Sequence, residues 1–150
     1  MRVIGFDPGE MTGVGILEVE NKKLVLKHSS TLARMDLYMK LPQLIAGADV
    51  VVIEDFKVRP NNARSGSFDW SHLVPVQVIG AIHYASIHAG IPTQFQQPNL
   101  KPIGFAYLGK KYVKGAKNVH HLDALAHAAY YLVKNRLALP NETLPQQKTG

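Results

Sequence analysis

The chain has 150 residues, 46% of them hydrophobic and 19% charged, which fits one globular domain with a sizeable core. It contains no cysteine, which excludes disulfides, thiolate metal sites and cysteine nucleophiles. Its apolar runs are too short to span a bilayer and its first residues lack signal-peptide architecture, so we expect a cytoplasmic protein.

The first third of the chain predicts three strands and a helical segment. Apolar, β-branched runs at 2–7, 14–20 and 24–30 are separated by turn-forming residues, which predicts an antiparallel meander. Residues 31–48 have a helical composition but contain Pro42. Because proline lacks a backbone N–H and its ring clashes with the preceding turn, we expect a break or two short helices there.

A buried strand and a long loop occupy the middle of the chain. Residues 49–55 (DVVVIED) are an apolar run bounded by acids, typical of a parallel strand buried on both faces, and we expect it to pair with the first strand. Residues 56–72 lack periodicity, which predicts a long, functional loop. A helix is expected over 73–90, ended by Gly90, and a short strand over 91–98.

The last third contains the strongest helical signal. Residues 99–117 are basic and aromatic without a clear periodicity, whereas 118–137 are rich in Ala and Leu with basic residues in the last turn. Together the elements predict an α/β fold with a mixed five-stranded sheet flanked by helices. We expect one domain over residues 1–138 and a polar tail over 139–150.

Positive charge is concentrated in the middle of the sequence. The net charge is +6, and between Asp55 and His120 there is one acid, Asp69, against eight basic residues. These are Lys57, Arg59, Arg64, Lys101, Lys110, Lys111, Lys114 and Lys117. Such an imbalance indicates a polyanionic partner, most commonly nucleic acid, although a solvated basic face would have the same composition.

Three acids and a histidine fall where a site would form. Asp7 and Glu54 each end a predicted strand, and ligands of α/β sheets collect at the carboxyl ends of strands. His120 and Asp123 share one face at the start of the last helix. Clustered carboxylates repel one another, and two bound divalent ions about 3.5–4 Å apart would relieve this and could drive phosphodiester cleavage.

Each of these acids also has a simpler explanation. Asp7 in a DPG sequence could be a turn former, Glu54 a solvated strand end, and Asp123 an acid favoured by the helix dipole. Three of eleven acids at matching places in the topology make the joint interpretation the stronger one.

Three blocks of this sequence resemble the RuvC-type Holliday-junction resolvases of the ribonuclease H-like superfamily. IGFDPGEMTGVGIL is similar to their opening strand–turn–strand, VVVIEDF to their second acidic block, and HHLDALAHAAYYL to their third. The blocks extend over residues 1–135. The segment between Lys101 and His120 is shorter than in the bacterial enzymes, which favours a compact bacterial or phage-type relative.

The resemblance implies a catalytic and metal-binding set of Asp7, Glu54, His120 and Asp123, holding two Mg²⁺ or Mn²⁺ ions. It further implies a homodimer that nicks four-way DNA junctions symmetrically. The residues it implies for DNA binding are Lys101, Lys110, Lys111, Lys114, Lys117, Arg59, Arg64 and Phe56. Phe56, Phe68 and Trp70 are candidates for base stacking, and packing in the core is the alternative for each.

The histidine in this set predicts a metal preference. Magnesium favours hard oxygen ligands and imidazole suits softer ions, so we expect Mn²⁺ to support activity at least as well as Mg²⁺. Activity should fall at acid pH, because a protonated His120 cannot bind metal. We expect His121 to lie outside the metal shell and His127 at the rim of the site, without a catalytic role.

Other functions share parts of this pattern. The D-x-G-x-x-T-G motif also resembles the first phosphate loop of actin and sugar-kinase ATPases, but those proteins need two lobes and this chain has one such loop. A small RNA-processing nuclease fold shares the first motif without the other two. A broader branched- or flap-DNA nuclease and a non-catalytic nucleic-acid-binding module of the same fold also stay open.

Overall fold

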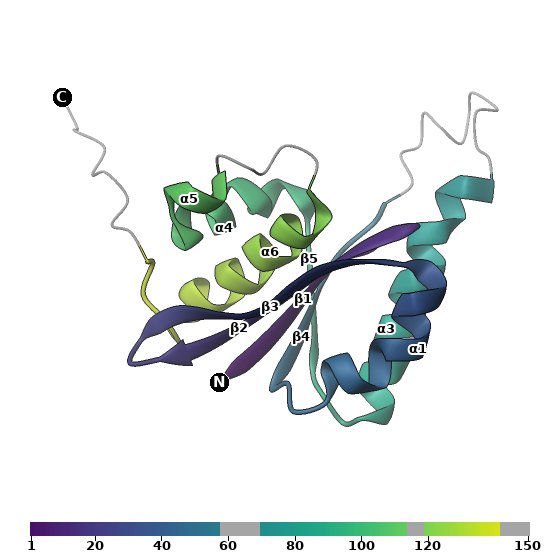
Figure 1. The fold of residues 1–150 in the computed structure, drawn as a ribbon, viewed down its shortest axis with the longest axis horizontal. Helices are drawn as coiled ribbons and strands as arrows, with labels where there is room; N and C mark the ends of the chain where they lie inside the picture. Colours follow the sequence, from purple (N-terminus) through teal and green to yellow (C-terminus); the bar gives the residue numbers. More distant parts are fainter. Residues whose placement is uncertain (58–69, 114–118, 142–150) are drawn as a thin grey trace.

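A computed structural model describes residues 1–57, 70–113 and 119–141. It contains one five-stranded sheet in the order β3-β2-β1-β4-β5, covered by helices on both faces (Figure 1). The strands are β1 Arg2–Asp7, β2 Met11–Glu20, β3 Lys23–Ala33, β4 Val50–Glu54 and β5 Thr93–Gln96. The helices are α1 Arg34–Ile45, α3 Val74–His88, α4 Lys101–Leu108, α5 Lys110–Val113 and α6 His120–Lys134, with short 3₁₀ turns η1 Trp70–Leu73 and η2 Pro98–Leu100.

The predicted topology of the sheet is confirmed. Strands β1, β2 and β3 form the antiparallel meander, and β4 pairs parallel with both β1 and β5. Strands β2 and β3 are longer than predicted, because the hairpin pairs from Glu20–Lys23 out to Met11–Ala33. Its turn residues Asn21 and Lys22 both have positive φ, as a two-residue hairpin turn requires.

The predicted break at Pro42 is wrong. Helix α1 runs through this residue from Arg34 to Ile45. Pro42 lies on the exposed side, while Leu37 and Leu41 are buried against the sheet and anchor the turns around it. Burial of this apolar stripe therefore outweighs the hydrogen bond that proline removes.

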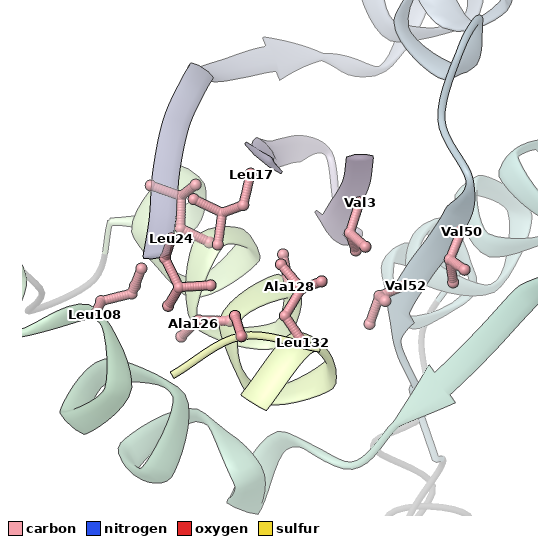
Figure 2. Close-up of a cluster of buried hydrophobic side chains, with 12 residues drawn as sticks. Val3, Leu17, Leu24, Val50, Val52, Leu108, Ala126, Ala128 and Leu132 are labelled. Carbon is pink, nitrogen blue, oxygen red and sulfur yellow. The ribbon is translucent and has the colours of Figure 1, made fainter. Parts of the chain in front are cut away.

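The two faces of the sheet have separate cores. One lies under α1 and α3 and is formed by the even-numbered side chains of β1, such as Ile4 and Phe6, with Val51 and Ile53 of β4. The other lies under α4 and α6, and its strand residues include Val3, Leu17, Leu24, Val50 and Val52 (Figure 2). Each helix of the described residues is too short or too polar to cross a bilayer.

Strand alternation fixes the side on which the two strand-end acids lie. Val3 and Gly5 of β1 face α6, so Asp7, two residues further on, faces α6 as well. In β4, Val52 belongs to the core on the same side, so Glu54, two residues further on, also faces α6. Both acids therefore point toward the helix that begins at His120.

Helix α6 lies unusually close to the sheet, over glycines. A Cβ atom added to Gly5 would be 2.1 Å from the carbonyl oxygen of Ala124, and one added to Gly13 would be 1.9 Å from that of His120. Real Cβ atoms do not approach an oxygen this closely, so a side chain at either position would force the helix away. Gly13 is paired with Asp7 across the hairpin, so this contact seats the start of α6 beside the strand-end acid.

We predict that Gly13→Ala lowers the free energy of unfolding by about 1–3 kcal/mol, the usual cost of overpacking. Chemical denaturation of the purified variant measures it. Gly80→Ala is the matched control, because Gly80 lies within α3 with no heavy atom within 4 Å of an added Cβ. It should be neutral or stabilising by roughly 0.5–1 kcal/mol. Equal stability of Gly13→Ala and wild type would contradict the close approach of α6.

Candidate active site

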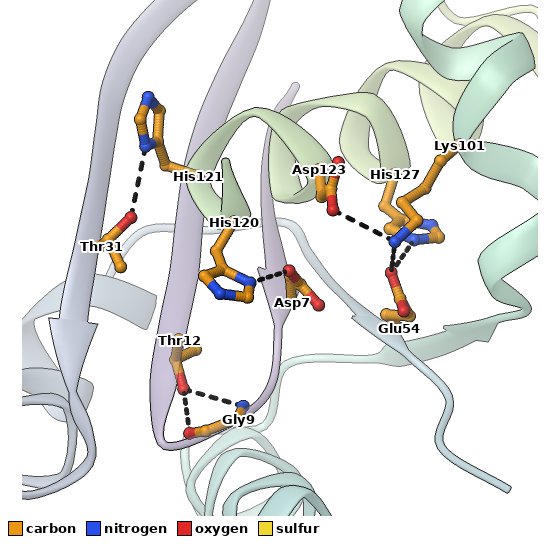
Figure 3. A network of polar contacts seen from close by, with 10 residues as sticks. All are labelled: Asp7, Gly9, Thr12, Thr31, Glu54, Lys101, His120, His121, Asp123 and His127. Atoms are coloured by element: carbon orange, nitrogen blue, oxygen red, sulfur yellow. Dashed lines mark hydrogen bonds and ion pairs between the residues drawn. The ribbon is translucent and has the colours of Figure 1, made fainter. Parts of the chain in front are cut away.

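The carboxyl ends of β1 and β4 meet the first turns of α6 at one edge of the sheet (Figure 3). His120 Nδ1 lies 2.7 Å from Asp7 Oδ2, at hydrogen-bond distance. Asp7 is 8% exposed, whereas half of the His120 side chain is accessible. The predicted juxtaposition of strand-end acid and helix histidine is thus present in the structure.

Lys101 joins the other two predicted acids. Its ammonium nitrogen lies 3.1 Å from Glu54 Oε2 and 3.1 Å from Asp123 Oδ2. All three side chains are less than one-quarter exposed, so solvent screens these ion pairs only in part. The lysine starts α4, which can pack closely on α6 because residue 104 is glycine: a Cβ atom added there would lie 2.0 Å from the carbonyl oxygen of Ala126.

His127 lies in the interior, so the expectation that it sits at the rim is wrong. The side chain is fully buried, with Nε2 2.8 Å from Glu54 Oε2 and Nδ1 2.7 Å from Gln96 Oε1. His127 is seven residues after His120, so both lie on the face of α6 that meets the sheet. Gln96 is paired with Glu54 across β4 and β5.

His127 and Gln96 were not among the predicted site residues. The signal that could have found them is the pairing of strand ends together with the spacing of His120, Asp123 and His127 on one helix face. His121 points elsewhere: its Nδ1 lies 3.3 Å from Thr31 Oγ1 on β3, on the far side of the helix start from Glu54 (Figure 3).

The two strand-end acids have opposite electrostatic environments. Burial raises the pKa of Asp7 above its usual range, and the nearby Glu54 charge raises it further, against a lowering effect of the His120 hydrogen bond. Burial also acts to raise the pKa of Glu54, but His127 and then Lys101 outweigh it and hold that pKa below the usual range. The Lys101 pKa is raised: burial acts to lower it, but the charges of Glu54 and Asp123 exceed that effect.

The donor set suits a divalent cation. In the described part of the chain, no three carboxylate and imidazole groups converge tightly enough to enclose an ion on their own. Nevertheless, the position of Lys101 Nζ shows that one cation can contact Glu54 and Asp123 together. Burial, with the nearby Glu54 charge, raises the pKa of Asp7, so a cation bound beside Asp7 would favour its ionised form. Carboxylate oxygens are the usual ligands of Mg²⁺ and Mn²⁺, and an imidazole nitrogen beside them suits the softer Mn²⁺ better than Mg²⁺.

A cavity of about 330 Å³ adjoins these groups. It is lined by Glu54 and Phe56, with Pro8, Gln97 and Pro98 among its other walls. Phe56, a predicted stacking residue, therefore lies beside the candidate site.

The remaining predicted DNA-binding residues are only partly placed. Lys110 is exposed on α5, and Lys111 lies on the same helix. The side chains of Lys111 and Trp70, and all of Arg59, Arg64, Phe68, Lys114 and Lys117, lie outside what the structure describes.

No protein-family model and no curated protein matches the sequence, but solved structures match the fold. Thermus thermophilus RuvC, in complex with a Holliday junction substrate, matches with a TM-score of 0.69 and 20% identity over 91% of this chain and 96% of its own. The chain has the RuvC-type fold. The yeast mitochondrial Holliday junction resolvase Ydc2 matches with a TM-score of 0.56 and 13% identity over 87% of this chain and 77% of its own. Fowlpox virus resolvase, in a complex with Holliday junction DNA, matches with a TM-score of 0.52 and 14% identity over 90% of this chain and 99% of its own.

Within this RuvC-type fold, the coverage of both chains means that the mixed sheet and its flanking helices are shared nearly in full. The edge where α6 meets β1 and β4 is therefore part of the common architecture. The identities are too low for these likenesses to establish more than the fold.

We predict that, in the absence of metal, Asp7→Asn is more stable than wild type by roughly 1 kcal/mol at neutral pH, because the variant removes a buried charge beside Glu54. The folded-state pKa of Asp7 is raised, so the advantage of the variant grows as pH rises through that raised range. Glu54→Gln should have the opposite effect, because ionised Glu54 stabilises the fold. This variant should be less stable than wild type at neutral pH, and the difference in stability should shrink as pH falls through the lowered pKa of Glu54. Urea unfolding of both variants in EDTA, across a pH series, measures this. An Asp7→Asn variant less stable than wild type at every pH would contradict the assigned environments.

Proposed function

We propose that this protein is a divalent-metal-dependent endonuclease that cleaves branched DNA, with the four-way junction as its preferred substrate. The observation that carries the proposal is that two sets of contacts, Asp7 with His120 and Glu54 with Asp123 through Lys101, lie at one edge of a RuvC-type fold. Two of the structural neighbours are resolvases in complexes with Holliday junction DNA.

In the proposed reaction, Asp7, Glu54, Asp123 and His120 would hold two Mg²⁺ or Mn²⁺ ions. When bound, such ions supply charge stabilisation and an activated water for phosphodiester hydrolysis. Lys101, within reach of two of the carboxylates, is positioned to hold the negative charge of the scissile phosphate. The basic residues predicted to bind DNA would contact neighbouring phosphates, and Phe56, which lines the cavity beside Glu54, would stack on a base.

A non-catalytic binding module would gain nothing from this edge. The carboxylates repel phosphate in the absence of metal, and burial with the nearby Glu54 charge raises the pKa of Asp7, so the ionised form of Asp7 is disfavoured in the fold. Cleavage by metal ions gives a reason for the arrangement that DNA binding alone does not. A nuclease acting on flaps as well as junctions has the same site and differs only in substrate preference.

We predict that the protein, in Mn²⁺ or Mg²⁺, nicks opposite strands of a synthetic four-way junction faster than a flap or a plain duplex of the same sequence. Asp7→Asn should lower the rate by roughly a factor of 100 or more, because a metal ligand is lost. Asp36→Asn, the same change on the exposed side of α1, should leave the rate unchanged.

His120→Asp should lower the Mn²⁺/Mg²⁺ rate ratio, since it exchanges an imidazole for an oxygen ligand. Gel analysis of end-labelled strands measures all of these.

Three outcomes would change the conclusion. Equal cleavage of junction, flap and duplex would remove the junction preference and leave the nuclease. Junction binding without cleavage in either metal would favour the binding module. An unchanged metal ratio in His120→Asp would take His120 out of the ligand set.

Symmetric nicking requires two active sites, and we propose that they come from a homodimer formed through α3. This helix exposes an apolar stripe on its outer side, including Val76 (45%), Tyr84 (71%) and Ile87 (63%). Met35 and Met39 of the neighbouring α1 are exposed as well. Exposed apolar side chains on two neighbouring helices are characteristic of subunit interfaces.

Sedimentation velocity is expected to give twice the chain mass of 16.6 kDa. Tyr84→Glu with Ile87→Glu should give the mass of one chain, because charges cannot be buried in the interface. Leu139→Glu is the control, since Leu139 is equally exposed (64%) but lies beside the β2–β3 turn on the other face of the sheet. A single-chain wild type, or a doubly substituted variant that stays dimeric, would contradict this interface.

A further inference from the structure

We infer that His127 is a positioning residue that holds Glu54 in the orientation needed to bind a metal ion, and so sets the metal affinity of the site. This inference rests on the proposed metal-dependent function. It extends that function to a pair of side chains, His127 and Gln96, that make no contact with substrate.

The first support is the completeness of the contacts around His127. The ring is fully buried between α6, β4 and β5, and both of its nitrogens have partners, at 2.8 Å on Glu54 and 2.7 Å on Gln96. A buried imidazole that only filled space would leave two polar atoms without partners, which is costly. A leucine or methionine would fill the same volume without that requirement. The side chain is therefore placed for its hydrogen bonds.

The second support is the direction of the bond to Glu54. A carboxylate that binds a metal ion accepts hydrogen bonds and does not donate them, so in the 2.8 Å contact His127 Nε2 donates its N–H to Glu54 Oε2. Gln96 can meet Nδ1 with either its amide oxygen or its NH₂ group, since the two are related by rotation of the amide. The ring thus keeps its N–H on Glu54 without needing a charge of its own.

The third support is the oxygen that is used. His127 and Lys101 both contact Oε2, at 2.8 and 3.1 Å, and within the described part of the chain Oε1 accepts no hydrogen bond. The buried His127 thus fixes Oε2, and Oε1 is left to bind a cation. Fixing the carboxylate in this way removes rotational freedom that metal binding would otherwise have to restrict.

The test separates the two hydrogen bonds of the ring. His127→Gln places an amide N–H near the position of Nε2 and can keep the bond to Glu54. His127→Asn is shorter, places its amide near Nδ1, and can keep only the bond to Gln96. His127→Leu keeps neither. Leu132→Ala, on the same helix but away from the site and fully buried, controls for loss of stability alone.

The readout is Mn²⁺ binding by isothermal titration calorimetry, without DNA, on the full chain at a temperature where thermal unfolding in EDTA shows each variant folded. His127→Leu and His127→Asn should bind Mn²⁺ about 10–100-fold more weakly than wild type, the usual effect of losing a residue that orients a ligand. His127→Gln should recover most of the affinity, and Leu132→Ala should bind as wild type.

The outcomes separate a failure of the role inferred for His127 from a failure of the proposed metal-dependent function. If wild type binds Mn²⁺ and the His127 variants bind it equally well, His127 is a structural residue and the inference is overturned while the proposed function stands. If Asn and Gln weaken binding alike, the bond to Glu54 is not what matters, and the inference is again overturned. If the wild type binds no Mn²⁺, the proposed function fails and the inference fails with it. Should His127→Leu not fold, the comparison of Asn with Gln decides.

Discussion

The close contact between α6 and the β1–β2 hairpin is the constraint on which the rest of the site depends. Gly5 and Gly13 leave no side chain between the strands and the helix backbone, so the helix start lies directly against the end of β1. His120 can then reach Asp7 at 2.7 Å. A few ångströms of additional separation, the thickness of a methyl layer, would leave the helix residues and the strand acids as separate groups. The apolar packing of Leu125, Ala128 and Leu132 holds the helix in this position.

This arrangement concentrates charge in a partly buried place, and the protein treats its two strand-end acids differently. Glu54 has a buried histidine and a lysine beside it, and its ionised form is stabilised. Asp7 has one hydrogen bond from a half-exposed histidine, and its ionised form is disfavoured by burial. A cation bound beside Asp7 would offset this cost, because it would stabilise the ionised form of that carboxylate. Proteins commonly accept such a loss of stability where function needs it.

Much of the fold and part of the site could be predicted from the sequence. The meander, the parallel pairing of β1 with β4, and the place of Asp7 and Glu54 at strand ends follow from local composition and alternation, because those signals act over a few residues. The continuity of α1 through Pro42 could not be predicted, since it depends on burial of Leu37 and Leu41 against the sheet. The position of Lys101 likewise depends on how closely α4 packs on α6 at Gly104, a contact between distant segments.

The sequence pattern around His127 predicts its helix face but not its burial. Its spacing from His120 and Asp123 puts His127 on the same face of α6 as those residues. Whether His127 is exposed or buried on that face depends on how far the strands of the sheet extend beneath the helix. Because β4 and β5 extend beneath it, His127 meets Glu54 and Gln96 in the interior. Polar residues on an otherwise apolar helix face, next to a candidate site, are therefore better regarded as parts of that site than as its border.

The central claim is that the edge formed by β1, β4 and the start of α6 binds divalent metal. A crystal of the protein grown with Mn²⁺ and measured for anomalous scattering tests this most directly. We expect an anomalous peak about 2.1 Å from an oxygen of Asp7, the usual distance from metal to ligand, with Glu54, Asp123 or His120 as a second ligand of the same ion. A fully ordered edge without such a peak at millimolar Mn²⁺, or ions bound only elsewhere on the surface, would contradict it.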